Sequence, residues 1–221
     1  ITFSNAATGS LGATTLVGGS TTGSTGTLNV LSGATPSFGN LFITNSGGTG
    51  MSGTINVNGT GSLLSQTGAS QLTVGNGTLG TATINIGTTA TDGTFSTGTG
   101  LTLINKTGTV NVGSGANSGT FNVNGDVTID NGALNLGAGS TFALASGKTM
   151  TIQNGGTATF SVNNYIPPSG AIYNVTGAGS TWQFTGSNSL PIVFNSQVNV
   201  SAGGTLSANA INVASNGTAG T

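Results

Sequence analysis

Short apolar–polar–apolar triplets recur along the whole chain, and no other feature restricts the fold as much. The purest form is Gly-Thr-apolar-Asn-apolar, which occurs at positions 26–30, 53–57, 108–112 and 119–123, with close variants at 82–86 and 132–136. Successive side chains of a strand point to opposite faces, so alternation with a period of two indicates β-strands. Gly, Asn, Ser and Asp cluster between the triplets, as turns require. No apolar stripe has helical spacing, and the chain is therefore predicted to be all-β.

Each predicted strand buries only two apolar side chains, whereas the strands of an antiparallel sandwich are longer, at about 5–6 residues. Stacking every strand on the equivalent strand one coil earlier buries a continuous apolar column, which is how solenoid proteins gain stability. We therefore expect residues 1–221 to form a single β-solenoid domain. With about 20–25 residues per coil, this parallel β-helix has roughly 9–11 coils.

The composition excludes several functional classes. The chain has five charged residues, Asp92, Lys106, Asp126, Asp130 and Lys148, and it contains no Glu, Arg, His or Cys. Without thiols or imidazoles there is no basis for thiolate chemistry, a histidine base or a soft metal site, so we expect no catalytic residue, cofactor or metal. A net charge of −1 without Arg gives no electrostatic basis for binding nucleic acid. No run approaches the roughly 20 apolar residues that a membrane-spanning helix needs, so this segment is not expected to insert into a membrane.

An enzyme remains an alternative, because solenoids also carry polysaccharide lyases and hydrolases. Asp126 and Asp130 flank the predicted strand 127–129 and share its outer face. Their Cα atoms would lie about 13 Å apart along a strand, whereas a hydrolase pair needs its carboxyl groups about 5–9.5 Å apart. The chain also lacks the repeated Asp pattern of a Ca²⁺-binding roll. We therefore predict that the protein is not an enzyme.

The central residue of the triplets is repeatedly asparagine, and this residue points outward when the two apolar residues point inward. Eight residues share this position: Asn29, Asn56, Asn85, Asn111, Asn122, Asn135, Asn199 and Asn212. Where the coils place them in register, their amides can hydrogen-bond along the stack. The functional interpretation is a polar surface for glycans or neighbouring fibres. The simpler interpretation is a solvated outer position that suits a turn-tolerant amide.

Three segments near the C-terminus carry a resemblance to a known family. They read V-T-G-A-G-S-T-W at 175–182, V-N-V-S-A-G-G-T-L at 198–206 and I-N-V-A-S-N-G-T at 211–218. They are similar to the strand-loop-strand repeat of bacterial autotransporter passenger domains and of large secreted β-strand-repeat proteins. A more divergent copy covers 57–63 and 72–78, where Leu64 takes the place of the tryptophan.

The resemblance implies a right-handed parallel β-helix outside a bacterial cell, acting as a cell-surface stalk, adhesin or matrix fibre without catalysis. Its partners would be cell-surface glycans or matrix, or further copies of the chain stacked end to end or laterally. The second hypothesis is a self-assembling fibre subunit of an extracellular sheath or matrix. Because an open β-helix exposes unpaired backbone groups at its ends, we expect the solenoid to continue in a longer chain or to stack as separate subunits.

Ice binding is a further alternative, because flat threonine arrays on uncharged solenoids bind ice. Outward threonine pairs are expected at Thr81/Thr83, Thr149/Thr151 and Thr157/Thr159. Their irregular spacing argues against one flat, uniform face.

The segment 163–173 interrupts the repeat and contains two adjacent prolines. Proline cannot donate to a strand ladder, so this segment is predicted to be a loop that leaves the coil. Tyr165, with Tyr173 and Trp182 nearby, is the candidate contact for a glycan or a partner. The alternative, which we favour, is an irregular turn whose aromatic side chains pack on the shaft.

Overall fold

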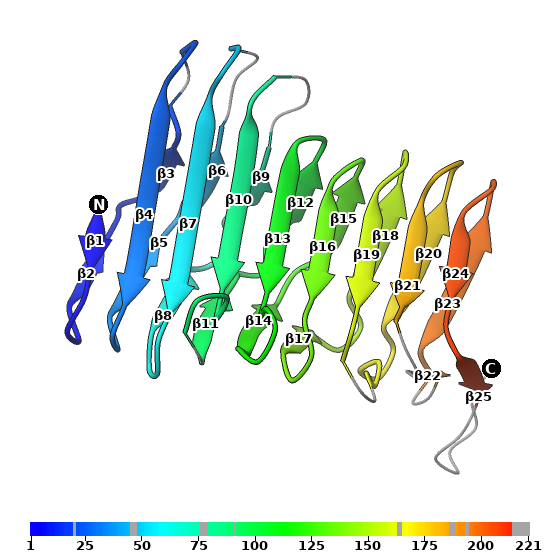
Figure 1. Ribbon diagram of the computed structural model, residues 1–221. Helices are drawn as coiled ribbons and strands as arrows, with labels where there is room; N and C mark the ends of the chain where they lie inside the picture. The colour runs from blue at the N-terminus through cyan, green and yellow to red at the C-terminus, as the bar shows by residue number, and fades with distance from the viewer. Residues whose placement is uncertain are drawn as a thin grey trace.

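The computed structural model shows a stack of parallel coils. It describes residues 1–19, 21–44, 48–75, 79–90, 92–162, 165–185, 189–192 and 195–213. All regular secondary structure within these ranges is β-strand, and every strand pair is parallel. Figure 1 shows the strands of successive coils side by side, from the blue N-terminal end to the red C-terminal end. The predicted parallel β-helix is confirmed.

Three sheets form the sides of the stack, and each coil contributes one strand to each side in the regular part. Sheet A consists of β1 (Thr2–Phe3), β4 (Thr25–Leu31), β7 (Ser52–Asn58), β10 (Thr81–Ile86), β13 (Gly108–Val112), β16 (Ala133–Leu136), β19 (Thr157–Phe160), β21 (Thr181–Phe184) and β24 (Thr205–Ser207). Sheet B consists of β2 (Thr8–Ser10), β5 (Thr35–Phe38), β8 (Leu63–Gln66), β11 (Gly93–Ser96), β14 (Gly119–Val123) and β17 (Thr141–Leu144).

Sheet C consists of β3 (Thr14–Val17), β6 (Asn40–Ile43), β9 (Leu72–Val74), β12 (Thr102–Asn105), β15 (Val127–Asp130), β18 (Thr149–Gln153), β20 (Ile172–Thr176) and β23 (Gln197–Ser201). Near the C-terminus, β22 (Ser189–Ile192) pairs with β25 (Ala210–Val213) as a separate two-stranded sheet.

The N-terminal coils are longer than the sequence repeat suggested. Along sheet A, equivalent asparagines are 27, 29, 26 and 24 residues apart. From Ala133 onward the coils of sheet A have 24 residues, within the predicted 20–25. The longer coils reduce the stack to about seven full coils instead of roughly 9–11.

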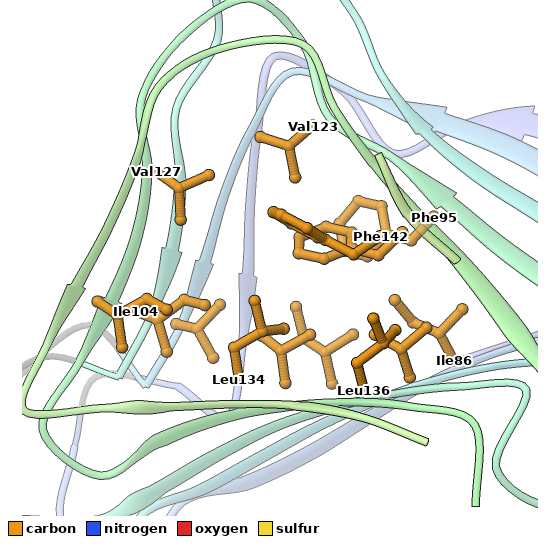
Figure 2. Packing of buried hydrophobic residues seen from close by; sticks show 14 of the residues in the cluster. Ile86, Phe95, Ile104, Val123, Val127, Leu134, Leu136 and Phe142 are labelled. Atoms are coloured by element: carbon orange, nitrogen blue, oxygen red, sulfur yellow. The ribbon is translucent and has the colours of Figure 1, made fainter. Parts of the chain in front are cut away.

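Alternation along each strand places the apolar side chains inside. Strand β10 has the pattern exposed–buried–intermediate–buried–intermediate–buried, with Ala82, Ile84 and Ile86 fully buried. Register then builds columns: Leu28, Ile55, Ile84, Val110 and Leu134 follow one another along the inner face of sheet A. Figure 2 shows such side chains filling the interior of the three-sided coil. Because burying one such side chain contributes about 1.5–3 kcal/mol, the columns stabilise strands that are too short to persist alone.

The glycine that leads the purest triplets of sheet A forms a corner between sheets C and A. Gly26, Gly53, Ala82 and Gly108 occupy one column across four coils. A Cβ atom on Gly108 would overlap the carbonyl oxygen of Val74, so the corner admits only glycine in that coil. The repeated Gly-Thr step is thus a packing requirement of the corner as well as a turn signal.

The interruption predicted at 163–173 is partly visible. Asn163 and Asn164 lie outside the described residues, as do residues 214–218 of the last repeat motif. Residues 165–171 contain no strand, and β20 begins at Ile172, so Tyr173 belongs to a strand of sheet C instead of the loop. Within the described ranges, no helix is long and apolar enough to cross a membrane.

Candidate functional site

The outer face of sheet A carries a ladder of asparagine side chains. Each amide nitrogen donates to the amide oxygen of the preceding coil: Asn56 to Asn29 at 2.9 Å, Asn85 to Asn56 at 2.9 Å, Asn111 to Asn85 at 3.0 Å and Asn135 to Asn111 at 3.0 Å. Asn29 donates in turn to the hydroxyl of Thr2 at 3.3 Å. The ladder ends at Asn135 because the next position in the column is Thr159, a shorter side chain without an amide.

The other three predicted asparagines lie outside this ladder. Asn122 is in sheet B between Ser96 and Ala143, so neither coil neighbour is an amide. Asn199 is in sheet C and donates to the amide oxygen of Asn174 at 2.9 Å, which makes a separate pair. Asn212 is opposite Pro191 in the two-stranded sheet. The structure therefore brings together five of the eight residues, because the same motif occurs in different sheets.

A column of threonines runs beside the asparagine ladder, two residues earlier in each strand. Its members are Thr27, Thr54, Thr83, Thr109, Ala133, Thr157, Thr181 and Thr205. Register aligns these triplets although they are unevenly spaced in sequence. The three predicted threonine pairs nevertheless do not share one face, in agreement with the expectation. Of the predicted pairs, Thr81/Thr83 and Thr157/Thr159 lie on sheet A, and Thr149/Thr151 lies on sheet C.

A shallow groove of about 430 Å³ follows one side of the asparagine ladder. One wall is formed by ladder-column residues from four consecutive coils, and the other by the segments that leave those strands. Its lining residues are Asn85, Asn111, Asn135, Thr159, Thr88, Gly113, Ser114, Leu136, Gly137 and Ser161. We call this feature the asparagine groove.

Glycines at the strand ends shape the segments beside the ladder. Gly87, Gly113 and Gly137 directly follow the aligned residues Ile86, Val112 and Leu136. Gly87 and Gly113 adopt positive φ angles of 62° and 70°, which lets the chain turn sharply away from sheet A. A Cβ atom on Gly87 would overlap the carbonyl oxygen of Ser118, and one on Gly113 would overlap the hydroxyl oxygen of Ser140, so these turns require glycine. The groove lies across the strands and hence along the stack axis.

The prediction that Tyr165, Tyr173 and Trp182 form an external contact site is wrong. Tyr165 is 6% exposed, and Tyr173 and Trp182 are fully buried, so none of the three presents a ring to an external glycan. Trp182 stacks on Tyr173 with ring centroids 4.7 Å apart, and Trp182 also packs against Phe160 and Phe184. Their position agrees with the alternative that we favoured from the sequence, in which these aromatic side chains pack on the shaft. Their neighbours in register, Met150 for Tyr173 and Ala158 for Trp182, are themselves core residues.

Burial also changes the acidity of the two tyrosines. Their hydroxyl groups lie 2.7 Å apart and are hydrogen-bonded to each other. Loss of solvation raises the pKa of Tyr165 well above its ordinary value, and the neighbouring Tyr173 raises it further. Burial likewise raises the pKa of Tyr173, although its hydrogen bond to Tyr165 opposes the shift. Both phenols are therefore structural and neutral at physiological pH.

The acidic residues have hydrogen-bonding roles between coils. Asp126 accepts a bond from the backbone N–H of Thr149 at 2.9 Å. Asp130 accepts from the side-chain amides of Gln153 and Asn154, each at 2.9 Å. Among the described residues, no three Asp, Glu, His or Cys side chains group together as metal ligands.

Comparisons with known proteins add little to this description. No protein-family model matches the chain, and no curated protein matches it. Among solved structures, the chain is similar to a TibC-catalyzed hyper-glycosylated TibA fragment, with 19% identity, 100% of this chain and 97% of that chain covered, and a TM-score of 0.23. A TM-score of this size supports no functional argument, so the assignment of the fold rests on the strand pairing itself.

Sequence reasoning missed the asparagine groove and the buried tyrosine pair. The groove depends on which asparagines and strand-end glycines align across coils, and unequal coil lengths hide this alignment in the sequence. A signal for the aromatic core was present, because Tyr173 and Val175, and Trp182 and Phe184, alternate as the inward residues of other triplets do.

Proposed function

We propose that the protein is an extracellular structural or adhesive shaft on the surface of a bacterium, with no catalytic activity. The observation that carries this proposal is the outer face of sheet A, where uncharged amides and hydroxyls repeat in register along a continuous parallel stack. Such a face offers many equivalent hydrogen-bonding groups but no cluster of reactive side chains. This arrangement suits contact over a long surface better than it suits turnover of one bound molecule.

The interior supports the role of a shaft. Phe95, Phe121 and Phe142 form an aromatic column in sheet B, with ring centroids 5.7 Å and 6.0 Å apart. Together with the aliphatic columns of sheets A and C, this column connects consecutive coils without a break. Because interiors of this kind are closely packed and resist deformation, the stack is suited to holding a surface at a distance. The low charge also allows close lateral approach, since little repulsion opposes it.

An adhesion assay tests the proposal. Beads coated with the protein are applied to bacterial cells, to extracellular matrix and to an array of neutral and acidic glycans, with beads coated with unfolded protein as the control. We expect the folded protein to bind at least one of these surfaces and to release no sugar from any polysaccharide. Failure to bind any of them would refute an adhesive role, and release of reducing or unsaturated sugar would refute the absence of catalysis.

The extracellular location needs its own test. An antibody against the protein, applied to intact cells of the source bacterium, is expected to label them without permeabilisation. Labelling that requires permeabilised cells would contradict the proposed location.

Self-assembly into a fibre is the second candidate function. In the last described coils, Val200, Ile211 and Val213 are 46%, 47% and 59% exposed. Val200 continues the inner column of sheet C, in which Ile152 and Val175 are fully buried. Sedimentation velocity distinguishes the two functions: growth of long, concentration-dependent particles supports the fibre, and a single small species at all concentrations opposes it.

A further inference from the structure

The asparagine ladder leaves half of its hydrogen-bonding capacity free. A side-chain amide has two N–H donors and an oxygen with two lone pairs. Within the ladder, Asn56, Asn85 and Asn111 each use one N–H toward the preceding coil and one lone pair toward the following coil. Each coil therefore presents one further donor and one further acceptor, repeated every 4.8 Å or so along the stack.

The groove selects the shape of what binds there. Asn85, Asn111 and Asn135 form its wall from three consecutive coils, and Thr159 extends the wall by a fourth. Its length is thus about 14 Å, three strand spacings of about 4.8 Å. An elongated molecule that lies along the stack axis meets the same groups in every coil, whereas a flat crystalline surface such as ice cannot enter a hollow beside the ladder.

Charge and aromatic content select the chemistry. Every residue that lines the groove is uncharged, and none is aromatic. An acidic or basic polymer finds no counter-charge there, so the fitting ligand is neutral and rich in hydroxyl groups. Each hydrogen bond contributes only about 0.5–1.5 kcal/mol net, and no ring is available for stacking. Binding must therefore draw on several coils together and grow stronger with ligand length.

Resting on the adhesive function proposed above, we propose that the asparagine groove binds a neutral linear polysaccharide whose chain lies along the stack axis. The free N–H and lone pair of Asn85 and Asn111 bond to sugar hydroxyls, and the hydroxyl of Thr159 adds a group two coils beyond Asn111. Thr88, Ser114 and Ser161 line the groove as well and add hydroxyl groups. The adhesive contact is then a defined groove of four coils, and the rest of the shaft supports it.

The test compares two substitutions in the same ladder. Asn111→Leu keeps the branched shape with the same number of side-chain heavy atoms but removes both free groups inside the groove. Asn56→Leu removes an amide with the same two ladder bonds, at 2.9 Å each, from a coil that does not line the groove. Circular dichroism and thermal unfolding first establish that both variants fold. Affinity electrophoresis then measures binding to neutral linear glucans, mannans and xylans, and isothermal titration calorimetry measures binding to their oligosaccharides of increasing length.

The proposal predicts that wild-type affinity rises with oligosaccharide length, that Asn111→Leu weakens it about tenfold, and that Asn56→Leu leaves it within about twofold. Equal effects of the two substitutions on a polysaccharide that does bind would overturn the groove as the site but leave adhesion intact. Binding to acidic polysaccharides only, or shaping of growing ice crystals without polysaccharide binding, would overturn the ligand class. No binding to any glycan, cell or matrix would overturn both this inference and the adhesive function.

Discussion

The hydroxyl groups of Tyr165 and Tyr173 lie 2.7 Å apart in the interior, and each is the hydrogen-bond partner of the other. Tyr165 comes from the irregular segment between β19 and β20, and Tyr173 comes from β20 itself. The bond therefore ties the interruption of the repeat to sheet C. Residues that seemed suited to an external contact instead hold the chain where the regular coil pattern fails.

This pairing predicts non-additive energetics. Tyr173→Phe leaves the buried hydroxyl of Tyr165 without its partner, which costs about 1–3 kcal/mol of unfolding free energy. Replacing both tyrosines by phenylalanine removes both polar groups, so the double variant should lose less than the sum of the single variants. Guanidinium unfolding of the four proteins measures the coupling. Strict additivity would show that the bond contributes nothing.

The raised pKa values of the two phenols predict loss of stability in alkali. Below about pH 10, the ordinary value, both phenols are neutral in the folded and unfolded chain, and their contribution is fully present. Above it, only the unfolded chain ionises readily, so stability falls as the pH rises toward the higher folded values. Phenolate absorbance should therefore appear together with loss of the β-sheet circular dichroism signal. Ionisation while the sheet signal stays intact would contradict the burial of the pair.

Substitution of Thr102 is expected to raise the stability of the protein instead of lowering it. It is fully buried between Leu72 and Val127 in an inner column of sheet C, and its hydroxyl has no hydrogen-bond partner. Thr102→Val removes the unpaired group at almost constant shape and should stabilise the protein by about 1–2 kcal/mol. Thr128→Val, on the outer face of the next coil, is the matched control and should change stability by less than about 0.5 kcal/mol. Thermal unfolding compares them, and a destabilised Thr102→Val would be the contrary result.

At the corner between sheets C and A, replacing glycine by alanine is expected to destabilise the protein more than the same replacement elsewhere. Gly108→Ala places a methyl group against the carbonyl of Val74 and should destabilise the protein by about 2–3 kcal/mol, since the backbone must shift. Gly9→Ala is the control, because its new methyl group meets only the ring edge of the Phe3 side chain, at 3.2 Å, and no backbone atom. Chemical unfolding should show a clear difference between the two. A similar loss of stability in both variants would mean that the close approach of Gly108 to the carbonyl of Val74 is not important for the corner.

The fold could be predicted from the sequence because alternation within each triplet fixes which side chains are inside. Ile84 and Ile86, for example, are buried on either side of the outward Asn85. The alignment between coils could not be predicted, because the coils along the asparagine ladder vary in length from 24 to 29 residues. That alignment decides the coil count and the membership of the asparagine ladder. It also decides the position of the groove, which no single segment of the sequence contains.

The most direct test of the stacked architecture is a distance between two spin labels on sheet A. The chain has no native cysteine, so Thr27→Cys and Thr181→Cys give two unique labelling sites in one outward column, six strand spacings apart. At about 4.8 Å per spacing, the account predicts a narrow distance distribution centred near 29 Å. A broad distribution, or a centre near the ~70 Å expected for a flexible segment of this length, would contradict the parallel stack on which the groove and its ligand depend.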